Sequence, residues 1–230
     1  MKTILCDPYL SDECKNKLSY MGYIVKEIPP FDKLPKPISS HPDILLFKLN
    51  DGSILMGEEY YRTFSDFYDS LGVNIITDPI SPCGGYPSDV LFDALAVGNT
   101  VYGKIGAVSG KLLDNYKRFV PVKQGYARCS VAMLNELSAV TADKGIAMVL
   151  KKDGVNVLEI CSGSVLLDGY DHGFIGGAGG KLNDAVYCFF GDLLRHPDGE
   201  KIRRFAESQK INAVSLSGEP LRDHGGFIIV

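Results

Sequence analysis

The chain has 230 residues, of which 45% are hydrophobic and 23% charged, and its formal net charge is −4. This composition is typical of a soluble globular chain with a sizeable core, and the negative charge leaves no basic face for a phosphate-backbone partner. We therefore expect one domain over residues 1–230 that does not bind nucleic acid.

The first segment, MKTILCDPYL, is interrupted at Asp7 and Pro8 before a signal-peptide core could form, and no stretch reaches about 18 uncharged apolar residues. The sequence therefore predicts a cytoplasmic protein without a membrane partner. Its six cysteines contain no C-x-x-C pair and no zinc-type spacing, which disfavours both a disulfide framework and structural zinc. No cofactor is expected.

Five segments have the apolar periodicity of amphipathic helices, and they recur along the chain. They span residues 11–21, 58–71, 108–117, 144–152 and 199–209. In the second segment Tyr60, Phe64 and Phe67 belong to one apolar stripe with three- and four-residue steps. The fifth opens on His196-Pro197-Asp198, which we interpret as a helix start capped by Asp198.

Short β-rich runs follow each predicted helix and complete a repeating β-β-α-β pattern. After each helix come a strand, a loop and a second strand, and the second strands begin at residues 43, 89, 130, 173 and 225. A third strand then leads to the next helix, except in the fifth unit, which ends without one. Residues 2–6 form a strand before the first helix, where this missing piece belongs. The pattern therefore predicts a closed ring of five units, an α/β propeller.

This repeat resembles the pentein fold, the guanidino-group-modifying superfamily of arginine deiminase, dimethylarginine dimethylaminohydrolase and the amidinotransferases. The chain is most similar to bacterial pentein-like proteins that carry a GFIGGAGG segment, a YP-x-D strand start and a terminal GG-x-I-x run. These correspond here to residues 173–180, 86–89 and 225–230. The resemblance implies a five-fold pseudosymmetric α/β propeller whose working site lies at the central axis. Membership of this group implies no particular activity.

Polar residues gather at the starts of the five second strands, which a small propeller places around its axis. The starts read His41-Pro42-Asp43, Tyr86-Pro87-Ser88-Asp89, Arg128-Cys129-Ser130, Asp171-His172-Gly173 and Asp223-His224-Gly225. Titratable groups collected at one place perturb one another's pKa values, which is typical of functional sites. We therefore predict a substrate-binding set consisting of Asp89, Arg128, Asp171, His172, Asp223 and His224.

The resemblance also implies a chemistry, in which a cysteine thiolate attacks a guanidinium carbon, a histidine acts as general acid and base, and carboxylates hold the cation. His41-Pro42-Asp43 matches the family's H-x-D element, and Cys129 enters a strand two units further round. Cys129, His41 and Asp43 are therefore the predicted catalytic residues, with Arg128 expected to lower the thiol pKa.

Two departures from the family pattern leave this assignment open. Phe227 stands where the family's Gly-Gly-Asp element has its acid, and the usual nucleophile near the C-terminus has no counterpart before Val230. The predicted function is a hydrolase or transferase acting on a guanidino or amidine compound. The alternative is a non-catalytic pentein that binds a small cationic ligand or a macromolecular partner through the same axial face. A purely structural polar set is a third possibility.

Two other interpretations of these residues are disfavoured. The first is a site for a divalent ion, with the ligands His41, Asp43, Asp89, His172 and His224. This hypothesis has less support than an organic ligand, because His and Asp are common at strand ends, and no metal is predicted. The segment GFIGGAGGK fails the phosphate-loop templates, since Ile175 occupies the first glycine position. Its glycines instead predict close backbone approach near the axis.

Overall fold

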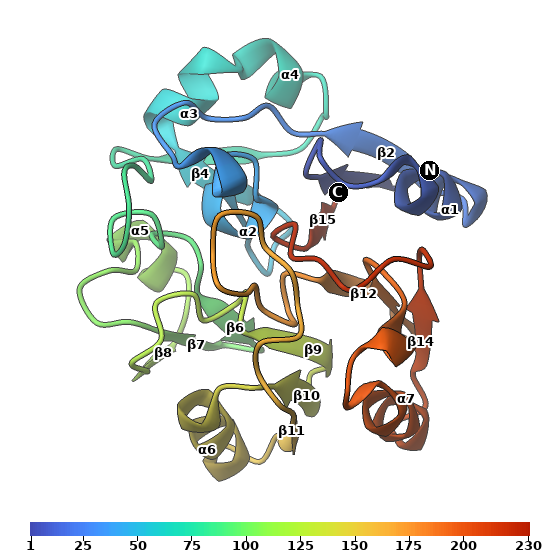
Figure 1. The fold of residues 1–230 in the computed structure, drawn as a ribbon. Helices are drawn as coiled ribbons and strands as arrows, with labels where there is room; N and C mark the ends of the chain where they lie inside the picture. The colour runs from blue at the N-terminus through green and yellow to red at the C-terminus, as the bar shows by residue number, and fades with distance from the viewer.

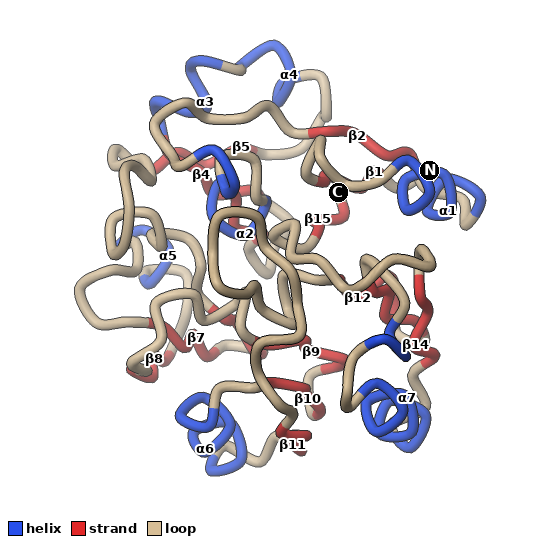
Figure 2. Tube along the Cα trace, viewed as in Figure 1, coloured by secondary structure: helices blue, strands red, loops and turns tan.

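The computed structural model describes residues 1–230, and its strands form five three-stranded sheets arranged in a ring around one axis (Figure 1). In every sheet the middle strand pairs antiparallel with one neighbour and parallel with the other. The helices lie mainly on the outside of the ring (Figure 2). The predicted five-fold α/β propeller is confirmed. None of the helices has the length and apolar character needed to cross a membrane.

The five sheets share one internal order, with an inner strand nearest the axis, then a middle strand and an outer strand. The inner strands are β3 (Leu46–Lys48), β6 (Leu95–Val97), β9 (Val131–Asn135), β12 (Gly179–Asn183) and β15 (Phe227–Ile229). The middle strands are β1 (Thr3–Cys6), β4 (Ile54–Gly57), β7 (Thr100–Gly103), β10 (Ser138–Thr141) and β13 (Val186–Phe189). The outer strands are β2 (Ile24–Glu27), β5 (Ile75–Asp78), β8 (Arg118–Pro121), β11 (Asn156–Glu159) and β14 (Asn212–Ser215).

The helices follow the predicted periodicity with three differences. They are α1 (Asp12–Tyr20), α2 (Pro42–Leu45), α3 (Glu58–Thr63), α4 (Ser65–Asp69), α5 (Gly110–Leu113), α6 (Lys144–Lys152) and α7 (Gly199–Ser208), with 3-10 turns at Lys36–Ile38 and Leu193–Arg195. The first difference is α2, a helical turn where a strand from residue 43 was predicted. Phe64 leaves the helical backbone region at φ −127°, so the segment predicted over residues 58–71 divides into α3 and α4. The third predicted helix shrinks to the single turn of α5.

The first and last strands close the ring, as predicted. β1 pairs antiparallel with β15 and parallel with β2, so it is the middle strand of its sheet. Ile4, Leu5 and Cys6 are fully buried. Ile4 packs in one apolar cluster with Phe227, and Leu5 packs in another with Ile228. Burial of this strand on both faces makes it part of the core and not an edge.

The inner strands begin later than predicted, because the segments before them bond to one another across the axis. Asp43 N–H donates to the Gly225 carbonyl over 3.1 Å, and Gly177 N–H donates to the Cys129 carbonyl over 3.0 Å. His224 N–H donates in turn to the Gly177 carbonyl over 3.0 Å. These bonds use backbone groups that would otherwise extend the sheets. The result is a tightly connected layer of turns at one end of the axis.

Candidate active site

Asp223 links the thiol of Cys129 to the imidazole of His41. Cys129 Sγ donates to Asp223 Oδ2 over 3.1 Å, and Asp223 Oδ1 lies 3.8 Å from His41 Nδ1. The backbone N–H groups of Phe174 and Gly225 donate to the Asp223 carboxylate over 2.8 and 2.9 Å and fix its orientation. Cys129 is 4% exposed, and His41 and Asp223 are each 2% exposed. The ring therefore places a cysteine and a histidine on one buried carboxylate.

Two further carboxyl groups, Asp43 and Asp93, lie beside the same thiol. One oxygen of each and the Cys129 sulfur lie within 4.8 Å of one another. Asp93 Oδ1 accepts the Cys129 N–H over 3.0 Å, whereas Asp43 Oδ1 and Asp93 Oδ2 have no hydrogen-bond partner. Buried oxygens without partners are costly, and either an organic cation or a metal ion would satisfy them.

The surroundings of Cys129 hold it in the thiol form. Burial raises the pKa of Cys129 well above its ordinary value, and the charges of Asp223, Asp43 and Asp93 raise it further. Arg128 was expected to lower this pKa, and that expectation is wrong. Its guanidinium donates to the Leu46 carbonyl over 3.3 Å, while the three carboxyl groups surround the sulfur.

Asp7 extends the polar cluster towards a second histidine. Asp7 Oδ2 lies 2.7 Å from His224 Nδ1, and Ser40 Oγ donates to Asp7 Oδ1 over 2.6 Å. Burial alone would raise the pKa of Asp7, but the hydrogen bonds from His224 and Ser40 lower it overall. A cavity of about 200 Å³ opens here, and its lining includes the acids Asp7, Asp168 and Asp223, the histidines His41 and His224, and the cations Lys36 and Arg222, of which Arg222 pairs with Asp168. We call it the acidic cavity.

Three predicted binding residues lie outside this cluster. Asp89 is buried but accepts a hydrogen bond from the Tyr126 hydroxyl over 2.6 Å. Asp171 is exposed, and His172 lines a separate cavity of about 190 Å³. His172 Nδ1 lies 3.0 Å from its neighbour's carbonyl oxygen, that of Gly173. The polar starts of units two and four are therefore not equivalent to those of units one, three and five.

Two residues of the cluster, Asp7 and Asp93, were missed in the sequence. Asp93 lies inside the apolar run DVLFDAL, which was interpreted as a continuous strand from residue 89. Asp7 was noted only as an interruption of a possible signal-peptide core. In both cases the sequence contained a usable signal, an acid directly beside residues predicted to be buried. A carboxylate in a buried position needs hydrogen-bond or charge partners, which points to a polar site.

The glycines of residues 173–180 permit the close backbone approach that their pattern predicts. A Cβ at Gly176 would lie 2.5–2.6 Å from the carbonyl oxygens of Val131, Arg128 and Cys129. A Cβ at Gly177 would lie 2.0 Å from Asp223 Oδ1 and 2.6 Å from Cys129 Sγ. This segment, which connects β11 to β12 and crosses the ring in Figure 1, covers Cys129 and explains its burial.

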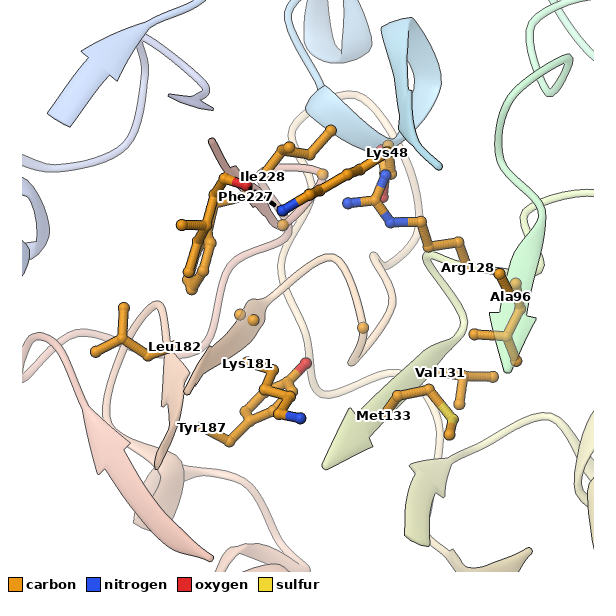
Figure 3. Close-up of a pocket in the computed structure, with 18 of the residues that line it drawn as sticks. Lys48, Ala96, Arg128, Val131, Met133, Lys181, Leu182, Tyr187, Phe227 and Ile228 are labelled. Carbon is orange, nitrogen blue, oxygen red and sulfur yellow. Dashed lines mark hydrogen bonds between the residues drawn. The ribbon is translucent and has the colours of Figure 1, made fainter. Parts of the chain in front are cut away.

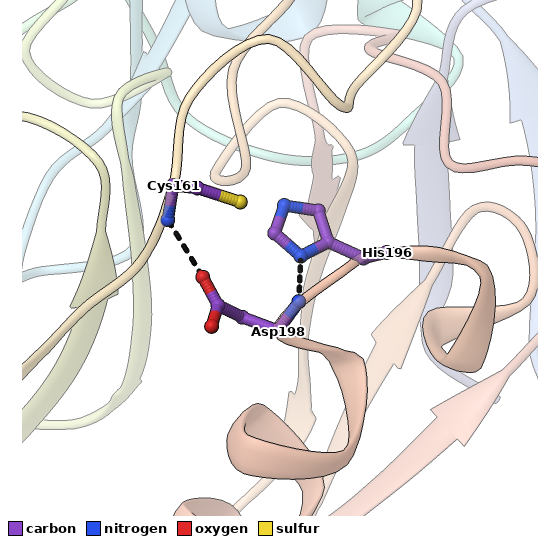
Figure 4. Close-up of side chains that lie close together, drawn as sticks. All are labelled: Cys161, His196 and Asp198. Atoms are coloured by element: carbon purple, nitrogen blue, oxygen red, sulfur yellow. Dashed lines mark hydrogen bonds between the residues drawn. The ribbon is translucent and has the colours of Figure 1, made fainter.

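A second group of cysteine, histidine and acid lies on the outer side, at the start of α7 (Figure 4). Asp198 occupies the predicted N-cap position, but its carboxylate accepts the Cys161 N–H over 2.7 Å and makes no side-chain capping bond. Asp198 N–H donates to His196 Nδ1 over 3.0 Å, which leaves the proton of the neutral ring on Nε2. That nitrogen faces Cys161 and has no lone pair for a metal.

Replacing Asp93 with Asn is expected to stabilise the ligand-free protein at pH 7 by about 1–2 kcal/mol, because an amide can still accept the Cys129 N–H without a buried charge. Burial and Asp43 raise the pKa of Asp93, so the native protein is less stable above that pKa and regains stability as the pH falls towards 3.8. The advantage of Asp93→Asn should therefore shrink towards pH 4, as followed by urea unfolding. Asp32→Asn, at an exposed acid, is the control; equal effects of the two substitutions would contradict this account.

Comparison with solved structures shows that the chain has the pentein propeller fold. A model of a family of unknown function, DUF6873, matches residues 5–228. A search of curated proteins finds no match. Among solved structures, a dimethylarginine dimethylaminohydrolase is 10% identical, with a TM-score of 0.56 over 94% of this chain and 92% of that chain. An inosamine-phosphate amidinotransferase from Streptomyces griseus is 14% identical, with a TM-score of 0.56 over 92% and 75% of the two chains. Agmatine deiminase from C. jejuni is 9% identical, with a TM-score of 0.56 over 94% and 86%.

Proposed function

The chain belongs to the family of unknown function DUF6873, and we propose that it is a hydrolase or transferase acting on a small guanidino or amidine compound at the ring axis. The observation that carries this proposal is the shared contact of Cys129 and His41 with Asp223, at 3.1 and 3.8 Å. A nucleophile and a proton carrier on one oriented carboxylate form the arrangement that covalent acyl- or amidino-transfer requires.

The charges at the axis favour a cationic substrate. Asp7, Asp43, Asp93 and Asp223 are buried together, and two of their oxygens lack hydrogen-bond donors. A planar guanidinium presents several N–H donors in a fixed geometry that suits paired carboxylates. Its positive charge would also oppose the three carboxyl charges that raise the pKa of Cys129. Substrate binding would in this way favour the reactive thiolate.

The proposed reaction uses five side chains. The Cys129 proton passes through Asp223 to His41, the sulfur attacks the guanidinium carbon, and the C–N bond to the departing amine breaks as that nitrogen receives this proton from His41. Water in a hydrolase, or an amine in a transferase, then attacks the sulfur-bound carbon and loses a proton to His41. The C–S bond breaks, and that proton returns through Asp223 to the Cys129 sulfur. Asp223 holds the histidine and the thiol in place, while Asp43 and Asp93 bind the cation.

Cys129 is buried, so in this proposal the binding of the substrate must expose its sulfur. The acidic cavity reaches His41 and Asp223 but does not include Cys129 in its lining. Asp223 stands between this cavity and the thiol, held by Phe174 N–H and Gly225 N–H. A guanidinium that draws the Asp223 carboxylate towards itself would expose the sulfur. The acidic cavity is therefore the proposed entrance.

Selective alkylation tests the proposal. Chloroacetamidine, a cationic electrophile, is expected to label Cys129 at least tenfold faster than chloroacetamide, its neutral analogue, as followed by peptide mass spectrometry. Cys83 and Cys161 are exposed and serve as internal controls that should show no such ratio. Asp43→Asn should lower the ratio at Cys129. Equal labelling of Cys129 by both reagents would remove the covalent mechanism.

A non-catalytic function as a receptor for a small cation is the second candidate, and the burial of Cys129 with its raised pKa favours it. Such a receptor needs the unsatisfied oxygens of Asp43 and Asp93 but no thiolate. Arginine and agmatine would then raise the melting temperature without being consumed, equally in the wild type and in Cys129→Ser. Consumption of either compound by the wild type and not by Cys129→Ser would exclude this candidate.

A further inference from the structure

A second, larger cavity lies at the opposite end of the axis, and cations outnumber acids in its lining. It has a volume of about 520 Å³ and is lined by residues of all five inner strands (Figure 3). Its cations are Lys2, Lys48, Arg128 and Lys181, against a single acid, Asp43. We call it the basic cavity. Cavities of this volume commonly enclose a small organic ligand.

The charge of Lys48 is disfavoured by its surroundings. The pKa of Lys48 is lowered, first by burial and then by the positive charge of Lys2. Lys48 Nζ donates to the Ile229 carbonyl over 2.7 Å and has no carboxylate partner. Lys181 is paired only with Asp184, which is fully exposed, and a pair of that kind contributes little. This end of the axis has four cations against one buried acid, Asp43.

Two more polar groups converge on the same space. The Arg128 guanidinium points into the cavity in Figure 3 and makes one hydrogen bond, to the Leu46 carbonyl over 3.3 Å, and no ion pair. The Tyr187 hydroxyl also points inward in Figure 3. Arg128 has further N–H donors in a planar fork, which is suited to carboxylate or phosphate oxygens. The rest of the wall is mainly apolar, with contributions from Phe47, Leu95, Val131, Met133, Phe227 and Ile228.

We propose that the basic cavity binds a small organic anion, a carboxylate or phosphate attached to an apolar body, between Arg128 and Lys48. The anion would accept hydrogen bonds from the free N–H groups of Arg128 and offset the repulsion of Lys48 by Lys2. Its apolar body would pack against the side chains of the inner strands. Asp43 is the one acid in the lining. Its burial raises its pKa, which reduces the negative charge that would repel a bound anion. The proposed ligand groups of the basic cavity, Arg128 and Lys48, differ from those of the cation chemistry proposed above, which enters through the acidic cavity; Asp43 is common to both sites.

Calorimetric titration with phenyl phosphate, benzoate, neutral benzamide and inorganic phosphate tests this assignment. At least one of the two aryl anions is expected to bind once per chain, and at least tenfold more tightly than benzamide and inorganic phosphate. Lys48→Gln should weaken that binding about tenfold, because a charge-assisted contact is lost. Lys111→Gln is the matched control, since Lys111 is likewise exposed and donates to a carbonyl, that of Thr77, over 2.7 Å.

The outcomes separate this site from the proposed reaction. Cys129→Ser should bind the aryl anion as the wild type does, whether or not the guanidino chemistry exists. Tyr187→Phe, which keeps the aromatic ring, should weaken binding of the aryl anion by a few-fold and leave the melting temperature nearly unchanged. The proposal is overturned if neither aryl anion binds at 10 mM, roughly the weak end of specific affinities. Equal binding of benzamide, or equal effects of Lys48→Gln and Lys111→Gln, would overturn it as well.

Discussion

Deletion of residues 1–7 is expected to leave the chain unfolded at 25 °C, because it removes the middle strand of the sheet that closes the ring. Ile4 and Leu5 are fully buried, and full burial of such side chains contributes about 1.5–3 kcal/mol each. The deletion also leaves β15 and β2 without the strand that bonds to both. Together these losses approach the whole stability of a domain, about 5–15 kcal/mol.

Far-ultraviolet circular dichroism during urea unfolding measures this effect. Removal of Met1 alone, a residue 92% exposed, is the control and should change little. A circular permutant that joins residue 230 to residue 1 and opens between Gly98 and Asn99 retains β1 in its sheet and should fold. Cooperative unfolding of the truncated chain, at nearly the same urea concentration as the full chain, would show that the ring does not need β1.

Substitution of Gly177 with Ala is expected to lower the free energy of unfolding by roughly 1–3 kcal/mol and to abolish selective labelling of Cys129. The added Cβ would stand 2.0 Å from Asp223 Oδ1 and 2.6 Å from Cys129 Sγ. Asp223 cannot turn away without breaking its bond to Gly225 N–H. The substitution would therefore disturb both the packing and the carboxylate that joins thiol and imidazole.

Thermal unfolding and chloroacetamidine labelling report these two consequences separately. Gly218→Ala is the matched control, because a Cβ there meets no atom within 4 Å. Each 1 kcal/mol lost corresponds to about 2–4 °C for a chain of this size. If Gly177→Ala had the same melting temperature and the same Cys129 labelling as Gly218→Ala, the close packing of residues 173–180 on Asp223 would contribute neither to stability nor to reactivity.

The repeat in the sequence was sufficient to predict the ring, because each of the five units shows the same periodic pattern of apolar residues that become buried. The bounds of α6, Lys144–Lys152, match their prediction, because Asp143 caps the helix and its apolar stripe is regular. The inner strands were less predictable. Asp43 belongs to the helical turn α2, and the stretch before Leu95 is irregular, because both bond across the axis to other units. Single-sequence periodicity does not contain such long-range contacts.

The same limit explains the candidate site. Cys129, His41 and Asp223 could be found because equivalent positions in three units meet at the axis. Asp171 was assigned by the same equivalence, but unit four places a longer stretch between this residue and β12, so it lies on the surface. Asp93 was missed because its run is apolar on both sides. Equivalence between repeats predicts a location only where the units have the same loop length.

The pairing of β1 with β15 also decides when the protein can become complete. β1 is synthesised well before its antiparallel partner β15. At a synthesis rate of about 5–20 residues per second, this wait lasts roughly 10–50 seconds. Until β15 is available, β1 lacks its partner on one edge, and an unpaired strand edge invites association between neighbouring chains. We therefore expect association to compete with folding most strongly before the ring closes.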